Sequence, residues 1–263
     1  MDAFISTIKD VIMDILQIDK VNQCCYDLLA KEYDDKCHRT CRDFEFIISK
    51  NLHVAFDKLD QACKHPLKDI IDIGTGTGNG IGYLLQNYPD NDFNIDILDI
   101  SKNMLDITQQ KYKDAIRSAH NRSIFDFISK TTKQYDLALS FLGDPYGNDY
   151  FIHNIKRIIK KDGFLLLCLP NYDWAVWTRK DNDKLNITYF KTADNKTLQS
   201  FSFVQNTDLL IDKYTHNGFK LLCDKSYSIH IDESKSTNIK SYLENNMNAP
   251  IIDIILLQRG QDD

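Results

Sequence analysis

The chain has 263 residues, enough for one large α/β domain or for a domain with an appended cap. Hydrophobic residues make up 43% of it and charged residues 27%, the composition of an ordinary globular protein. Its net charge of −6 argues against a large nonspecific nucleic-acid surface, and no apolar run approaches the roughly 18 residues of a membrane-spanning helix. We therefore expect neither a membrane protein nor a general nucleic-acid-binding protein.

The seven cysteines are an odd number in a chain too large to need disulfide staples, so we expect reduced thiols. Five of them cluster near the N-terminus with His38 among them: Cys24, Cys25, Cys37, Cys41 and Cys63. A zinc site is the alternative interpretation, but the segment has no C-x-x-C pair, and we predict no metal. Asp2, Asp10 and Asp14 interrupt the apolar N-terminus, unlike a secretory signal, so we expect a cytoplasmic protein.

Apolar residues recur at helical spacing within residues 3–20. This predicts a helix that packs on the domain, or alternatively one that serves as a lid or a dimer contact. A longer helix is predicted over residues 44–62, ending near Pro66 because proline cannot continue a helix. We therefore divide the chain into an N-terminal helical cap, residues 1–66, and a main domain, residues 67–260.

A glycine-rich turn opens the main domain. The apolar run of residues 70–73 predicts a buried parallel strand, and apolar residues at helical spacing within 81–88 predict a helix after the turn. Four glycines lie between strand and helix: Gly74, Gly76, Gly78 and Gly80. Glycine lets the backbone turn sharply and lets a ligand lie directly on the main chain. The stretch is therefore a candidate ligand-binding turn, with an ordinary tight turn as the alternative.

The pattern of the turn separates the ligands that it could bind. A phosphate-binding P-loop ends in Gly-Lys-Ser/Thr, and Gly78-Asn79-Gly80 lacks the lysine. The dinucleotide fingerprint G-x-G-x-x-G puts Asn79 or Ile81 where its third glycine belongs. What remains is an acid, Asp72, two positions before a G-x-G-x-G run.

A second acid follows the second predicted strand. Residues 93–98 predict this strand, and Asp99 stands at its carboxyl end, 21 residues after Gly78. Doubly wound sheets place an acid there to accept hydrogen bonds from two ribose hydroxyls. The alternative role for Asp99 is a helix cap. Ser101 is the predicted N-cap of the next helix.

The later elements continue the strand–helix alternation. The third strand is predicted at residues 115–120 or 122–125, and a helix from Asp149 is predicted to end at residues 160–163. The remaining strands are predicted at residues 135–142, 164–169, 219–231 and 251–257. Residues 171–206 break the alternation and predict an inserted β-hairpin with strands at 185–190 and 198–204, followed by a helix from 207 to Gly218. The fold class is α/β, with a doubly wound, mostly parallel seven-stranded sheet.

These motifs together resemble the class I S-adenosylmethionine-dependent methyltransferases over about residues 26–258. The resemblance rests on four stretches: Asp72-Ile-Gly-Thr-Gly-Thr-Gly78, Leu98-Asp-Ile-Ser-Lys-Asn-Met-Leu105, Tyr135-Asp-Leu-Ala-Leu139 and Ile158-Ile-Lys-Lys-Asp-Gly-Phe164. The resemblance implies S-adenosylmethionine as cofactor, with Asp72 and the glycines near its methionyl amine and sugar and Asp99 on the ribose. It also implies the following cofactor contacts: Tyr33, Arg39, Asp72, Gly74, Thr75, Gly76, Gly78, Asp99, Ile100, Met104, Ser123, Ile124 and Ser140.

One position departs from the family pattern. Many members carry an aspartate after the third strand to bind the adenine amino group, whereas Ser123 stands nearest that place here and Asp126 comes three residues later. The main chain of Ile124 is the expected substitute.

The N-terminal segment carries a second resemblance. Tyr26-Asp, Ala30 and Tyr33-Asp34 resemble the opening of small-molecule N- and O-methyltransferases. In the members similar to glycine N-methyltransferase, a tyrosine here and an arginine six residues later reach the active site. Tyr33 and Arg39 have that spacing. The resemblance implies that Arg39 binds the methionyl carboxylate, a task that suits the planar guanidinium. A solvated basic helix face is the alternative.

The expected reaction is methyl transfer from S-adenosylmethionine to an oxygen or nitrogen of a small-molecule acceptor. It is an in-line displacement that needs a dedicated base only when the nucleophile is protonated, so no catalytic residue is assigned. The expected substrate contacts are Tyr26, Asp144, Tyr146, Asn171 and Trp174. The alternatives are a protein or RNA methyltransferase and a noncatalytic cofactor-binding scaffold or partner subunit. We expect a monomer or a homodimer.

Overall fold

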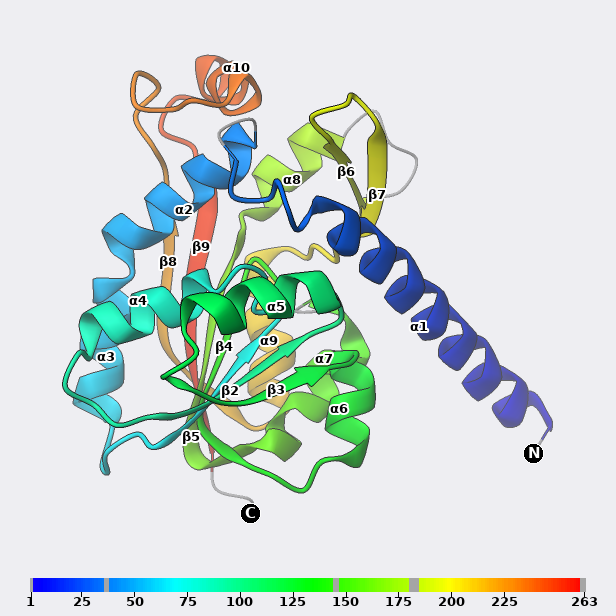
Figure 1. Ribbon diagram of the computed structural model, residues 1–263, viewed down its shortest axis with the longest axis vertical. Helices are drawn as coiled ribbons and strands as arrows, with labels where there is room; N and C mark the ends of the chain where they lie inside the picture. Colours follow the sequence, from blue (N-terminus) through cyan, green and yellow to red (C-terminus); the bar gives the residue numbers. More distant parts are fainter. Residues whose placement is uncertain (1, 36–37, 144–146, 180–184, 261–263) are drawn as a thin grey trace.

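The computed structural model describes residues 2–35, 38–143, 147–179 and 185–260, with side chains from residue 15 onward. Seven strands form one sheet in the order β3-β2-β1-β4-β5-β9-β8 (Figure 1). Their bounds are β1 (Asp69–Ile73), β2 (Asn94–Asp99), β3 (Ile116–Asn121), β4 (Tyr135–Phe141), β5 (Ile159–Pro170), β8 (Phe219–Tyr227) and β9 (Ile252–Arg259). Pairs among β1 to β5 are parallel, and β9 runs antiparallel to β5 and β8. The predicted fold class is confirmed.

Helices cover both faces of the sheet. On one face lie α2 (Arg39–Asn51), α3 (His53–Ala62), α4 (Asn79–Asn87), α5 (Lys102–Lys111) and α10 (Thr237–Asn245). On the other lie α6 (Ile124–Lys130), α7 (Asp149–Asn154), the 3₁₀ turn Ile155–Ile158 and α9 (Thr207–His216). Alternate residues of each strand feed the two cores because successive side chains of a strand point to opposite faces. Leu166 of β5 packs on the first core and Leu165 on the second.

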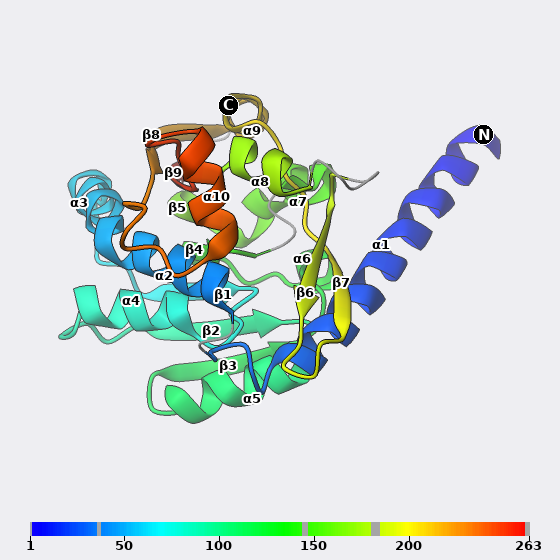
Figure 2. The same ribbon diagram turned by 90° about the horizontal axis from the view of Figure 1, so that it is seen from above.

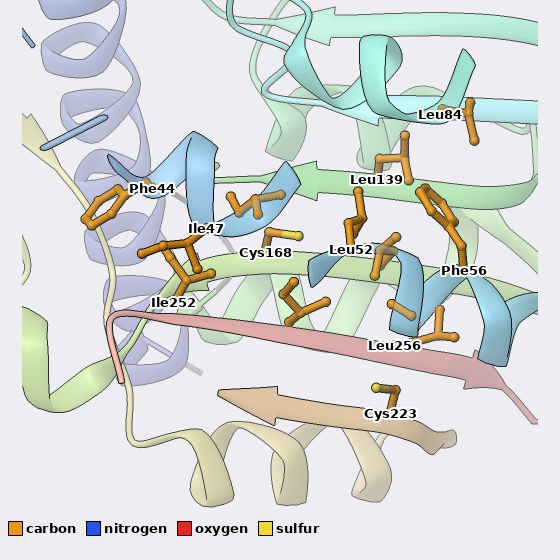
Figure 3. Close-up of a cluster of buried hydrophobic side chains, with 14 of the residues drawn as sticks. Phe44, Ile47, Leu52, Phe56, Leu84, Leu139, Cys168, Cys223, Ile252 and Leu256 are labelled. Carbon is orange, nitrogen blue, oxygen red and sulfur yellow. The ribbon is translucent and has the colours of Figure 1, made fainter. Parts of the chain in front are cut away.

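The N-terminal helices belong to the first core. Ile47, Leu52 and Phe56 pack against Leu139, Cys168 and Leu256 of the sheet (Figure 3). The single helix predicted over residues 44–62 is divided at Leu52 into α2 and α3, although its apolar stripe continues through both. The first helix, α1 (Asp2–Leu29), is longer than predicted, and its N-terminal end projects away from the sheet (Figure 1).

The predicted hairpin is present as β6 (Ile187–Lys191) and β7 (Thr197–Phe201). Asn22 of α1 holds it: Nδ2 donates to Phe201 O at 2.9 Å, and Oδ1 accepts from Phe201 N at 2.7 Å. Figure 2 shows β7 beside the C-terminal half of α1. Two helices in this part of the chain were missed, α8 (Tyr172–Arg179) and α10, because each is a short segment within a stretch whose alternating pattern predicts strands or loops.

One predicted helix end is wrong. Residues 160–163 begin β5, because the helical stripe ends with α7 and the 3₁₀ turn, and Ile159 already pairs with Tyr135. Lys160-Lys-Asp-Gly163 fits a helix C-terminus by composition alone. Asp162 takes a left-handed conformation, φ 60°, at the irregularity where the register of β5 shifts. The third strand lies at the first of its two predicted positions, and residues 124–130 form α6.

The first halves of β1 and β2 hold paired carboxylates. Arg117 donates from Nε to Asp96 Oδ1 at 2.9 Å and from Nη1 to Asp69 Oδ1 at 2.8 Å. Lys133 Nζ and Tyr135 OH bind Asp96 Oδ2 at 2.5 and 2.7 Å. Burial alone would raise the pKa of Asp96, but the hydrogen bonds from Arg117 and Lys133 outweigh it and lower the pKa. These acids stabilise the sheet as ion pairs.

A buried carboxylate joins α2 to the segment before α10. Asp43 is 3% exposed and accepts from Lys235 N at 3.0 Å, Ser236 N at 2.9 Å and Ser234 Oγ at 2.6 Å. Ser236 in turn caps α10 by accepting from Ile239 N. The contacts fix the N-terminus of α10 beside α2.

Replacing Asp43 by alanine is expected to lower the free energy of unfolding by about 2–4 kcal/mol, because it leaves buried N–H groups without an acceptor. Urea unfolding measures the change. Asp57→Ala removes an exposed acid from α3 and is the matched control, with an expected change within about 0.5 kcal/mol. Equal effects of the two substitutions would contradict the assigned role of Asp43.

Candidate active site

A cleft opens at the carboxyl ends of β1, β2 and β4, where doubly wound sheets bind their ligands. Its floor is the glycine turn, and α1 and α2 close one side. The described residues that line it are Ile18, Asp19, Asn22, Tyr26, Tyr33, Glu45, Ile48, Asp72, Ile73, Gly74, Thr75, Gly76, Thr77, Asn79, Gly80, Tyr83, Leu98, Asp99, Ile100, Met104, Arg122, Ser123, Ile124, Phe125, Phe141, Leu142, Gly143 and Phe203.

The glycine turn has the backbone geometry that its sequence predicts. Gly74, Gly76 and Gly78 have φ values of 65°, 54° and 89°, a region that side chains with a Cβ rarely adopt. Gly80 serves a different purpose, since a Cβ there would lie 3.0 Å from Asp72 Oδ1. The glycines thus allow the main chain to fold tightly over a buried carboxylate.

Asp72 lies beneath this turn. It is 1% exposed, and its Oδ2 accepts from Thr75 Oγ1 at 2.7 Å. Burial raises its pKa to about 7, and the nearby charge of Asp99 adds to the shift. A carboxylate so poor in partners is suited to an ammonium group or to hydroxyl donors of a ligand.

Asp99 ends β2 and is held by main-chain donors. Its Oδ2 accepts from Gly76 N and its Oδ1 from Ser101 N, both at 2.8 Å. Burial raises its pKa to about 6 in spite of these bonds. Ser101 is the helix N-cap predicted from the sequence, with its side chain accepting from Met104 N. Asp99 is therefore fixed in orientation while it lines the cleft.

Glu45 is a cleft residue that sequence reasoning missed. Its carboxylate binds Arg42, with Nη1 to Oε2 at 2.5 Å, and accepts from Asn79 Nδ2 at 2.6 Å. Burial raises its pKa to about 7, although Arg42 opposes the shift. No motif marks Glu45 in the sequence, because it reaches the glycine turn only through the packing of α2 on α4.

A second cavity of about 610 Å³ adjoins the cleft, and Tyr26, Tyr33 and Leu142 line both. It lies between the N-termini of α2 and α10, the helix α8 and the hairpin. Its other described lining residues are His38, Arg39, Thr40, Cys41, Phe44, Pro170, Trp174, Ala175, Thr178, Arg179, Thr188, Tyr189, Phe190, Lys191, Thr197, Ser202, Ser236, Thr237 and Asn238.

Most of the expected cofactor contacts converge on the cleft: Tyr33, Asp72, Gly74, Thr75, Gly76, Asp99, Ile100, Met104, Ser123 and Ile124. Gly78, Ser140 and Arg39 do not line it. Gly78 caps α4, and a Cβ there would lie 2.7 Å from the Tyr112 ring. Ser140 is buried in β4, and Arg39 lines the second cavity instead.

The expected substrate contacts divide similarly. Tyr26 lies where cleft and cavity meet, and Trp174 lines the cavity. Asn171 lines neither: its Nδ2 donates to Asp253 and its Oδ1 accepts from Asp173 N at the start of α8. Asp144 and Tyr146 lie outside the described residues.

Several cleft residues were not predicted because they come from segments without a motif. Asn22 and Asp19 lie on α1, Tyr83 on α4, and Phe141 and Leu142 at the end of β4. The sequence does hold a signal for Phe141 and Leu142, because they lie at the carboxyl end of a predicted strand, where residues reach the ligand in such sheets. Nothing in the sequence of α1 shows which of its turns reaches the cleft.

The comparisons with known proteins agree with this geometry. Residues 70–163 match the methyltransferase domain family. An S-adenosylmethionine-dependent methyltransferase from Listeria monocytogenes is 14% identical, with a TM-score of 0.57 over 78% of this chain and 96% of that one. DhpI in complex with S-adenosylhomocysteine is 13% identical, with a TM-score of 0.58 over 93% and 98% of the two chains.

A third solved structure is a Haloferax volcanii methyltransferase in complex with the Trm112 methyltransferase activator. It is 15% identical, with a TM-score of 0.58 over 90% of this chain and 98% of that one. At these identities the structures show a shared fold. A search of the curated proteins gives no significant match.

The sheet order and the acidic cleft over the glycine turn define a class I methyltransferase fold. Residues 70–163 match the methyltransferase domain family within this fold, so the chain contains a methyltransferase domain. S-adenosylmethionine is the cofactor of this class. The residues present fit it, because an ammonium and a sulfonium are cations and the cleft is lined by four acids, Asp19, Glu45, Asp72 and Asp99.

Two further findings concern the rest of the chain. Among the described helices, none combines the length and the apolar character that crossing a membrane requires. Six described cysteines carry free thiols, and the described residues contain no cluster of histidine, cysteine and acidic side chains that could hold a metal.

Binding of S-adenosylhomocysteine is expected to tighten at least about fourfold between pH 5.5 and 8, because Asp99, with a pKa of about 6, ionises over that range. Asp72 and Glu45, with pKa values of about 7, act in the same direction. Calorimetry at both pH values measures the change. Asp99→Asn is expected to show a smaller dependence of affinity on pH. An affinity of the unsubstituted protein that is constant or falls toward pH 8 would contradict a contribution of ionised Asp99 to binding.

Proposed function

We propose that this enzyme transfers a methyl group from S-adenosylmethionine to an oxygen or nitrogen of a small-molecule acceptor. The observation that carries the proposal is the second cavity, whose volume of about 610 Å³ lies within the range of small-molecule sites. Tyr26, Tyr33 and Leu142 line both cavity and cleft, so a molecule in the cavity has access to the cofactor's reactive end.

The roles of the cleft residues are part of this proposal. Asp99 accepts hydrogen bonds from the ribose hydroxyls, and Asp72 with the main chain of the glycine turn holds the methionyl part. Ile100 and Met104 pack on the adenine, beside Ser123 and the main chain of Ile124. In support, all of these residues line the same cleft. The assignment of the methionyl carboxylate to Arg39 has no such support, because Arg39 lines the other cavity.

Catalysis in this proposal consists of alignment and exclusion of water. Methyl transfer from a sulfonium is an in-line displacement with a good leaving group, and alignment can contribute several kcal/mol. Tyr26 and Tyr33 form the wall between donor and acceptor, where aromatic faces favour a cationic sulfonium. Residues 1–66 act as a cap over the domain of residues 67–260, since α1 and α2 border both cavities.

A noncatalytic partner subunit is the alternative from another class, and one of the structural neighbours is a complex with an activator. In that case the chain would bind cofactor without turnover. We favour the enzyme because the cleft leads into a cavity that can hold an acceptor.

Calorimetry with S-adenosylmethionine tests the first step, and no binding at micromolar to millimolar concentrations would refute the proposal. Incubation with a metabolite extract tests the second, with formation of S-adenosylhomocysteine as the readout. We expect turnover with the low-molecular-mass fraction. Turnover only with protein or RNA fractions would favour those acceptors, and binding without any turnover would favour the scaffold.

Replacing Asp99 by asparagine is expected to weaken binding of S-adenosylhomocysteine at least about tenfold, because a charged acceptor of hydrogen bonds is lost. Calorimetry measures it, and thermal unfolding checks that the variant is folded. Asp106→Asn removes an exposed acid of α5 that pairs with Lys102 and is the control, with affinity unchanged. An unaltered affinity in Asp99→Asn would exclude ribose binding by this residue.

A further inference from the structure

The two neighbouring cavities differ in charge. The cofactor cleft is lined by four acids, Asp19, Glu45, Asp72 and Asp99. The second cavity has neither aspartate nor glutamate among its described lining residues, although acids outnumber bases by 38 to 32 in the chain. Its charged lining residues are Arg39, Arg179 and Lys191.

The N-terminus of α2 contributes to the same cavity. Arg39, Thr40 and Cys41, the first residues of this 13-residue helix, line the cavity, and the N-cap residue His38 provides no side-chain cap. The first N–H groups of a helix lack intrahelical acceptors and carry a partial positive charge. Such a helix end is therefore suited to an anion.

His38 is a second, independent observation. Its side chain is buried, 9% exposed, and lines the cavity, yet its Nε2 has no hydrogen-bond partner among the described residues. Its near neighbour Glu32, with Oε1 at 3.9 Å, accepts from Ala193 N at the turn of the hairpin and does not line the cavity. A buried polar nitrogen without a hydrogen-bond partner among the described residues is available to a polar group of a ligand.

Aromatic side chains also line the cavity. Tyr26, Tyr33, Phe44, Trp174 and Phe190 line the cavity, and Trp174 packs against both Phe44 and Trp177. These side chains favour a flat or apolar molecular body. Asp43 lies outside the lining: it is bound to Lys235 N and Ser236 N, which leaves the first turn of α10 at Thr237 and Asn238 facing the cavity.

We propose that the methyl acceptor is an anionic small molecule, one whose carboxylate or phosphate binds at the N-terminus of α2 beside His38 and Arg39 while its apolar body packs on the aromatic walls. The proposal rests on the function proposed above, since it names the acceptor class of that enzyme. The acceptor's reacting oxygen or nitrogen then lies toward Tyr26, Tyr33 and Leu142, where cavity and cleft meet.

Tryptophan fluorescence tests the anion site without knowledge of the natural acceptor. The chain has two tryptophans, of which Trp174 lines the cavity and Trp177 stacks on it at 5.9 Å between ring centroids. The probes are phenyl phosphate and benzoate, with benzyl alcohol as the neutral and benzylamine as the cationic comparison. We expect saturable quenching by at least one anion, at least about tenfold tighter than by either comparison probe and weaker at high salt.

Two variants that each remove one positive charge locate the anion. Arg39→Gln is expected to weaken binding of the anionic probe about tenfold. Lys220→Gln, at an exposed position of β8 outside the cavity, should leave the affinity unchanged. Equal effects of the two variants, equal binding of benzyl alcohol or benzylamine, or no saturable binding by any probe would overturn the proposal.

A separate experiment distinguishes failure of the methyltransferase function from failure of the anionic acceptor class. The metabolite extract is divided by ion exchange into anionic, neutral and cationic pools, and each is incubated with S-adenosylmethionine that carries a labelled methyl group. Label in the anionic pool supports both proposals. Label only in the neutral or cationic pool overturns the anionic class and leaves the methyltransferase function standing, whereas failure to bind S-adenosylmethionine overturns the function and leaves the fluorescence titration to decide the anion site.

Discussion

The site depends on two buried carboxylates that have no cationic partner among the described residues. Asp72 and Asp99 are both buried. Asp72 accepts a hydrogen bond from the Thr75 hydroxyl, and Asp99 accepts from Gly76 N of the turn and from Ser101 N at the start of α5. Such burial disfavours the charged form of each carboxylate, and it leaves carboxylate oxygens that can accept hydrogen bonds from a ligand. Gly80 follows from this constraint, because a side chain there would approach the carboxylate of Asp72.

The pKa values of the aspartates are shifted in opposite directions at the two ends of the strands. Asp96 is paired with Arg117 and Lys133, so its lowered pKa contributes stability that is present above about pH 4 and is lost as the pH falls below it. The raised pKa values of Asp72 and Asp99 have the opposite sign: the native state binds more protons than the unfolded chain between about pH 4 and 7, so these groups reduce stability as the pH rises through that range. Acids at one end of the strands thus stabilise the fold, whereas the acids at the cleft lower its stability near neutral pH and are available to bind a ligand.

The sequence predicts the sheet and the glycine turn beneath the cleft because both depend on local signals. Residues 70–99 contain a strand, a left-handed glycine turn and an acid at a strand end, each marked by residue type and spacing. Other features depend on packing between distant segments. Glu45 reaches the glycine turn only through α2, and Arg39 faces the second cavity although its spacing from Tyr33 indicates a cofactor contact. The helix end predicted at Lys160-Lys-Asp-Gly163 is wrong for a related reason. The composition is typical of a helix end, but pairing of this segment with β4 makes it part of a strand.

The attachment of the hairpin to α1 has a consequence for the cleft and the second cavity. Asn22 lines the cofactor cleft and also binds the main chain of Phe201, while Ser200 Oγ donates to its Oδ1 at 3.1 Å. Hydrogen bonds therefore tie the helix that lines the cleft to the hairpin that lines the second cavity. A movement of α1 would therefore shift β7 with it, so the cleft and the second cavity would widen or narrow together.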